Sequence, residues 1–114
     1  MSSPPQTLET ALGGAPQRTR HDPLSELRNI GPAMRADLEK LGIQTINELA
    51  ASNADVLYLR LSEISGQRQD PCVWDVFAAA IHQARSGEAR DWWAFTPMRK
   101  AREERGEFPH GLQN

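Results

Sequence analysis

The chain has 114 residues, of which 39% are hydrophobic and 25% charged, with a net charge of -2. This length fits one folded domain, and this charge excludes a strongly basic nucleic-acid-binding protein, so any phosphate site must be local. The single cysteine excludes an internal disulfide, and with no secretory signal it indicates a cytoplasmic protein. No run approaches the ~20 apolar residues of a membrane span, so no membrane partner is expected.

The two ends of the chain have turn-rich compositions. The first 22 residues are rich in proline and glycine, and this composition predicts a disordered N-terminal arm. The residues concerned are Pro4, Pro5, Gly13, Gly14 and Pro16. The sequence GEFPHGLQN closes the chain, and we expect residues 106–114 to form a flexible tail. One domain is therefore predicted over residues 23–105.

The first part of this domain predicts two short helices joined by a turn. Its apolar residues are spaced three or four apart along one helix face: Leu27, Ile30, Met34, Leu38 and Leu41. Pro32 suits a first helical position, and Gly42 ends the helix. Thr45 and Glu48 form the pattern of a capping box for a second helix, with Ile46 and Leu49 directed inward.

Three further helices follow. Asn53 is placed to cap a helix over residues 54–64, with an inward set of Val56, Leu57, Leu61 and Ile64. The pair Asp70-Pro71 opens a helix over residues 71–86, whose inward stripe is Val73, Val76, Phe77, Ala80, Ile81 and Ala84. Thr96-Pro97 is a second cap-plus-proline pair and opens a basic helix over residues 97–105. No segment alternates convincingly at period two, so we predict a compact all-α bundle of about five helices.

The turn before the first helix is the first candidate site. A turn that opens a helix leaves backbone N–H groups without internal acceptors, and the helix dipole adds partial positive charge. Gly31 permits close approach of a phosphate, Asn29 tolerates a left-handed backbone, and Arg28 and Arg35 flank the turn. The same turn also fits a purely structural corner or a protein contact. Residues 24–50 hold three basic and four acidic side chains, fewer cations than a duplex-binding surface normally has.

The segment LRNIGPAMRADLEKLGI, residues 27–43, resembles a helix-hairpin-helix motif. The resemblance implies a SAM-like helical fold and sequence-independent binding of DNA backbone phosphates. The residues it assigns to that site are Arg28, Asn29, Ile30, Gly31, Ala33 and Arg35. Asn29 replaces the usual first glycine, Ala33 stands where DNA-binding members often have lysine, and Arg35 stands where a small residue is common.

A longer resemblance covers residues 23–103. The ordered pieces LRNIGPAM, VLYLRL, GQRQDPC, VFAAAI and WWAFTPMRK are similar to the bacterial helix-hairpin-helix proteins known as pathogenicity locus or mitomycin-resistance proteins. The C-terminal domain of TfoX-type competence regulators is a more distant relative by the same hairpin. The mitomycin association implies a DNA-damage or stress context, and the family label implies no reaction.

The second candidate site is the basic segment near the C-terminus. Its proposed contact residues are Trp92, Trp93, Arg99, Lys100 and Arg102, because arginine and aromatic side chains together can stack on bases. The alternative is that one tryptophan closes the core and the arginines form a solvated face. Two adjacent tryptophans cannot point the same way from a helix, so we expect one near the surface.

The remaining reactive residue types do not form a recognisable catalytic set. Cys72 follows a proline at a helix start, where the dipole can lower its pKa, although a small buried side chain is the alternative. His21, His82 and His110 are far apart, and we predict no metal site, cofactor or catalytic residue. The sequence therefore predicts a non-enzymatic DNA-binding protein or, alternatively, a protein–protein interaction module. It does not predict the oligomeric state.

Overall fold

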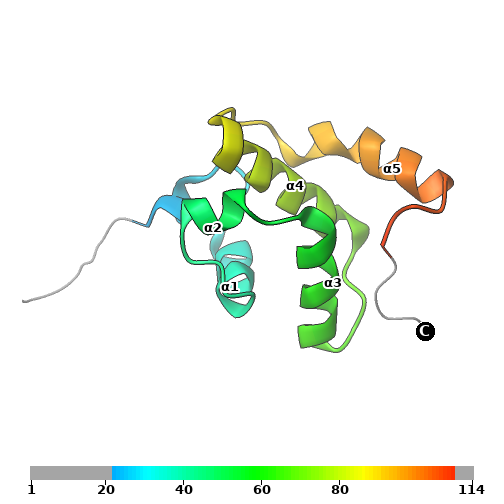
Figure 1. Ribbon diagram of the computed structural model, residues 1–114, viewed down its shortest axis with the longest axis horizontal. Coiled ribbons are helices and arrows are strands. Elements are labelled where there is room, and N and C mark those ends of the chain that lie inside the picture. Colours follow the sequence, from blue (N-terminus) through cyan, green and yellow to red (C-terminus); the bar gives the residue numbers. More distant parts are fainter. Residues whose placement is uncertain (1–21, 110–114) are drawn as a thin grey trace, which may run out of the picture.

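A computed structural model describes residues 22–109 (Figure 1), and the helical fold predicted from the sequence is confirmed. This part of the chain contains five α-helices, two 3-10 helices and no strand. The elements in chain order are η2 (Pro23–Glu26), α1 (Pro32–Lys40), α2 (Ile46–Ala50), α3 (Ala54–Ser65), α4 (Pro71–Ser86), η3 (Trp92–Phe95) and α5 (Thr96–Glu104).

Helix α4 is the centre of the fold and packs against α2, α3, η3 and α5 (Figure 1). Its start follows the predicted signal, because the Asp70 carboxylate accepts a hydrogen bond from Cys72 N (2.8 Å) and Pro71 needs no acceptor. It ends at Gly87, whose φ of 79° lies in the left-handed region that favours glycine. Of its predicted inward residues, Phe77, Ala80 and Ile81 are buried.

The turn between α1 and α2 also forms as predicted. Gly42 follows the end of α1 with a φ of 82°, and Leu38 is fully buried on the inner face of that helix. The Thr45 hydroxyl accepts from Glu48 N (3.0 Å), while the Glu48 carboxylate accepts from Thr45 N (3.1 Å). This reciprocal capping box gives a five-residue helix a defined start.

The buried face of α3 differs from the prediction. Leu57 and Leu61 are buried as expected, but Val56 and Ile64 are half exposed. Tyr58 and Ser62 fill the face instead, because both hold the chain that follows the helix: the Tyr58 hydroxyl donates to Gln69 O, and the Ser62 hydroxyl accepts from Gln69 N. Tyr58 and Ser62 thus share the buried face of α3 with Leu57 and Leu61.

The buried face of α4 and the start of α5 differ from the prediction. Trp74 and Asp75, outside the predicted stripe of α4, are buried because the helix has neighbours on several sides. Thr96 does not cap α5, since no side chain caps that helix and the Thr96 hydroxyl instead donates to Asp75 Oδ2 (2.7 Å). The predicted basic helix itself is confirmed at Thr96–Glu104.

The boundaries of the domain are wider than predicted. Asp22, placed in the arm, accepts hydrogen bonds from Ser25 Oγ (2.7 Å) and Arg35 Nε (2.7 Å), while residues 1–21 lie outside the described part. Phe108, which the sequence placed in the flexible tail, is buried. The centroid of its ring lies 5.3 Å from that of Tyr58 and 5.9 Å from that of Trp74. The expectation of a flexible tail is therefore wrong for residues 106–109, and residues 110–114 lie outside the described part.

Candidate functional site

The turn before α1 brings Gly31, Pro32 and Ala33 to the surface. Gly31 is the N-cap residue with extended backbone (φ -90°), and no side chain of the described residues caps the helix. The Ile30 N–H donates to Leu27 O (3.1 Å), and within the first turn of α1 the Arg35 N–H donates to Gly31 O (2.8 Å). The amides of the first helical turn are therefore open to a ligand, and Ile30 is buried beneath them as a core residue.

Asn29 does not face a ligand but holds the chain before η3. Its Nδ2 donates to Arg90 O (2.8 Å), and its Oδ1 accepts from Trp92 N (3.0 Å). Arg28 supports the same contact, because its Nε lies 2.8 Å from Asp91 Oδ1. We call these contacts from Arg28 and Asn29 to residues 90–92 the Asn29 latch. A glycine at this position could make neither of the two side-chain hydrogen bonds of Asn29.

Arg35 also forms an ion pair within the fold. Its Nε pairs with Asp22 Oδ2 at 2.7 Å, and hydrogen bonding from Arg35 is the main reason why the pKa of Asp22 lies below its ordinary value. The Nη1 atom of Arg35 is buried without an acceptor among the described residues. Both arginines beside the turn are therefore paired with carboxylates, which lowers the positive potential that they offer to a phosphate.

The two arginines of α5 are paired with carboxylates inside the fold, Arg99 buried and Arg102 partly buried. Arg99 is buried and donates to both oxygens of Asp75, through Nε (2.9 Å) and Nη2 (3.2 Å). Arg102 makes the same two-pronged contact with Asp55, at 2.9 and 2.8 Å. These hydrogen bonds are the main cause that raises the pKa of each arginine above its ordinary value. Neither side chain is free to neutralise a phosphate, whereas Lys100 is exposed.

Trp92 and Trp93 line an open hollow of about 680 Å³ between the start of α4 and the start of α5. We call it the tryptophan hollow, and its lining residues are Cys72, Trp92, Trp93, Thr96, Pro97, Arg99 and Lys100. Trp93 is 59% exposed, as expected for one of the pair, and Trp92 is half-buried. Neither of the two belongs to the core cluster of the described residues, in which the buried tryptophan is Trp74.

Cys72 is not activated by its position at a helix start. Burial, and then the hydrogen bond to the Asp70 carboxylate, raise the pKa of the thiol above its ordinary value. The direction of this shift favours the alternative, a structural side chain at the start of α4, over a reactive thiolate.

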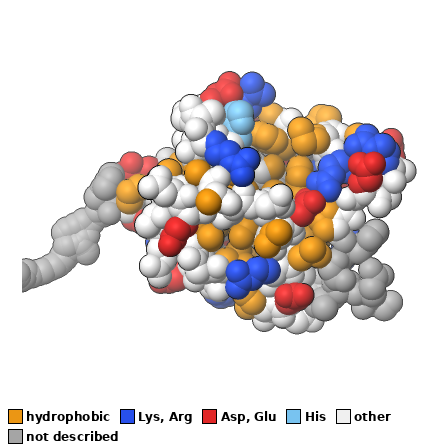
Figure 2. Space-filling view, viewed as in Figure 1, with side chains coloured by type: hydrophobic (Ala, Val, Ile, Leu, Met, Phe, Trp, Pro, Cys, Tyr) orange, Lys and Arg blue, Asp and Glu red, His pale blue; other side chains and the backbone are white. Residues whose placement is uncertain are grey.

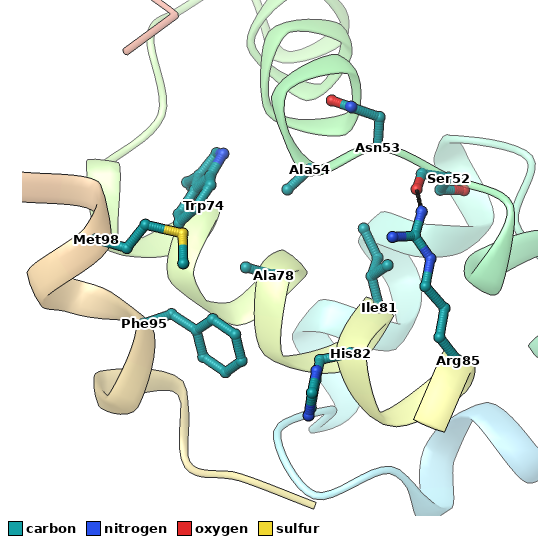
Figure 3. A pocket seen from close by; sticks show the side chains of 10 residues that line it. All are labelled: Ser52, Asn53, Ala54, Trp74, Ala78, Ile81, His82, Arg85, Phe95 and Met98. Carbon is teal, nitrogen blue, oxygen red and sulfur yellow. Dashed lines mark hydrogen bonds between the residues drawn. The ribbon is translucent and has the colours of Figure 1, made fainter. Parts of the chain in front are cut away.

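A second hollow, of about 270 Å³, lies between α4, the start of α3 and the side chains of Phe95 and Met98 (Figure 3). Phe95 and Met98 border it on one side and Ala54 on the other, with Ala78 on its floor. Apolar side chains also gather over the middle of the face in Figure 2, with charged groups around them. Arg85 donates to Ala50 O (2.7 Å) and Ser52 O (2.8 Å) and so satisfies carbonyls at the end of α2.

Two further observations concern other classes of site. Within residues 22–109, no three His, Cys, Asp or Glu side chains are grouped to hold a metal ion. None of the helices in the described part is long and apolar enough to cross a membrane.

Comparison with known proteins agrees with the resemblance seen in the sequence. Residues 17–101 match the sequence model of the family described as Cdd1, pathogenicity locus. The chain belongs to this family. This pathogenicity locus protein is 40% identical over 77 residues to the mitomycin resistance protein McrB of Streptomyces lavendulae, an alignment that covers 68% of the chain and 73% of McrB. No solved structure matches it. The more distant likeness to TfoX-type regulators stays a prediction.

Proposed function

We propose that this protein is a non-enzymatic DNA-binding protein that holds a backbone phosphate at the start of α1 without reading the bases. The observation that supports this best is the open first turn of a nine-residue helix, where Gly31, Pro32 and Ala33 are all exposed and no side chain caps the amides. A phosphate satisfies such amides and gains from the helix dipole. The resemblance of residues 27–43 to helix-hairpin-helix motifs supports the same ligand.

The name of the Streptomyces relative supports a DNA-damage context, because that protein is described by mitomycin resistance. We expect binding to be weak, since Arg28 and Arg35 are already paired with Asp91 and Asp22. One or two phosphate contacts predict a shallow salt dependence, with a slope of log affinity against log salt of about -1 to -2.

The experiment is fluorescence anisotropy of a labelled DNA duplex, titrated with the full chain at low and moderate salt. The decisive variants are at Ala33, which is exposed in the first turn of α1. Ala33→Glu adds a negative charge beside the amides. A negative charge near the start of a helix also stabilises that helix through the helix dipole, so weaker binding would not result from unfolding of α1. We expect Ala33→Glu to weaken binding about two- to fivefold and Ala33→Lys to strengthen it by a similar factor.

The matched control is Gln67→Glu, which makes the same change of charge on the exposed loop after α3. It should leave affinity almost unchanged. Equal effects of Ala33→Glu and Gln67→Glu would show that the start of α1 is not the contact. No duplex binding at ~50 µM protein in low salt would exclude the DNA function, because nonspecific binders usually reach that affinity.

A protein–protein interaction module is the second candidate function. It is favoured by Trp93 and Met98, which expose 59% and 56% of their surface close together in the chain. Exposed tryptophan is enriched at the energetic centres of interfaces. This function predicts no duplex binding and a partner whose affinity tolerates salt.

A further inference from the structure

We propose that the tryptophan hollow binds a nucleotide of single-stranded nucleic acid, with its base stacked on Trp93 and its phosphate at Lys100. This proposal rests on the proposed DNA-binding function and adds a second contact of a different kind. It is supported by the geometry of the two rings, by the charges around the hollow and by the link between the hollow and the start of α1.

The two indole rings form an aromatic corner that suits a planar ligand. Their centroids are 5.6 Å apart and their planes meet at 81°, so Trp92 presents its ring against Trp93 edge to face. This contact supports Trp93 while 59% of its surface stays open to solvent. Every base has an apolar face that can stack on such a ring, which makes the contact tolerant of sequence. A duplex keeps its bases stacked inside, and we therefore infer a single strand.

The charged residues that line the hollow favour binding of an anionic group near Trp93. Arg99 lies at the floor, but Asp75 and Glu103 neutralise it, at 2.9 and 3.2 Å. Lys100 is exposed, and no carboxylate of the described residues lies within ion-pair distance of it. An open cation next to an open aromatic face matches a nucleotide, which carries a phosphate within reach of its base.

The Asn29 latch joins this hollow to the turn before α1. Asn29 accepts from Trp92 N (3.0 Å), and α1 begins three residues later at Pro32. The turn that carries the open amides is thus hydrogen-bonded to the first residue of the tryptophan pair. We therefore infer that one strand contacts both places.

The test compares three labelled ligands with the full chain at low salt. They are a strand of about twelve thymidines, an abasic strand of the same length, and a duplex, followed by anisotropy and by tryptophan fluorescence. We expect the thymidine strand to bind and to quench fluorescence, and the abasic strand to bind more weakly. Trp93→Ala should weaken thymidine binding at least about tenfold, and Trp93→Phe should restore most of it. Lys100→Gln should reduce the salt slope by about 0.7.

Met98→Ala is the matched control, since Met98 is equally exposed but lines the other hollow. Equal binding of the abasic and thymidine strands would overturn the proposal, as would equal effects of Trp93→Ala and Met98→Ala. Absence of thymidine binding at ~50 µM protein would overturn it as well and would leave the hollow as a surface for a protein partner. The two proposals fail in different ways. Duplex binding tests the start of α1, and we expect Ala33→Glu to weaken it and Trp93→Ala to leave it unchanged. Thymidine-strand binding tests the tryptophan hollow, and we expect Trp93→Ala to weaken it.

Discussion

Asp75→Ala should destabilise the protein more than most single substitutions in this domain. Asp75 is completely buried, and the side chain of Arg99 is only 8% exposed. The carboxylate accepts both guanidinium bonds, at 2.9 and 3.2 Å, and the Thr96 hydroxyl at 2.7 Å. These three bonds tie the start of α5 to the central helix. Their loss leaves a buried guanidinium with Glu103 as its remaining carboxylate.

The expected magnitude follows from burial. Removing one partner of a buried ion pair leaves the other charge desolvated and typically costs about 3–5 kcal/mol. A small domain is stable by only about 5–15 kcal/mol, so Asp75→Ala removes a large part of that margin. Arg99→Met should cost a similar amount, because it leaves Asp75 buried without its charged partner.

Urea unfolding at neutral pH, followed by far-UV circular dichroism, measures these changes. The informative control is the double variant Asp75→Leu with Arg99→Met, which removes both charges and is compared with the single variants Asp75→Leu and Arg99→Met. We expect it to be more stable than either single variant, since no buried charge is left without a partner. A loss of less than about 1 kcal/mol for Asp75→Ala, or simple additivity in the double variant, would refute the reasoning.

Three other changes are predicted. Phe108→Ala should lower the free energy of unfolding by about 3–5 kcal/mol in the same urea assay, because the ring is buried in the core. Hydrogen bonds from Arg102 hold the pKa of Asp55 below its ordinary value of 3.8, so the charged carboxylate favours the folded state. Its contribution is present near neutral pH and is lost as the pH falls from about 5 towards 2, and Asp55→Asn should show a smaller loss of stability over that interval. Asn29→Ala should speed hydrogen exchange at the amide of Trp92, measured by NMR, because that N–H loses its acceptor.

The sequence was sufficient for most helix boundaries. Pro32, Gly42, the Thr45–Glu48 capping box and the Asp70-Pro71 pair each act within four residues of themselves, so the chain carries these signals locally. The family was also recognisable from ordered short motifs. The prediction failed for Thr96 because η3 leads directly into α5, so Thr96 already has helical backbone angles (φ -61°, ψ -42°), whereas a capping residue is extended.

The candidate site was predictable only in part. The open first turn at Gly31 follows from local rules, and so does an exposed tryptophan in the pair. The roles of the charged residues do not follow from those rules, because Arg28 and Asp91 are 63 residues apart and Arg102 and Asp55 are 47 apart. Nothing in the neighbourhood of either arginine indicates that it is paired.

The sequence by itself thus determined where the helices begin and end and which family the chain resembles, since caps, turns and apolar spacing are local properties. Only the tertiary structure decided which face of α3 is buried, that Phe108 completes the core, and that Arg99 binds Asp75. The physical reason is that burial and ion pairing depend on which distant side chains packing brings together. A basic residue is open to a ligand only when the fold leaves it without a carboxylate, as it does for Lys100 among the described residues.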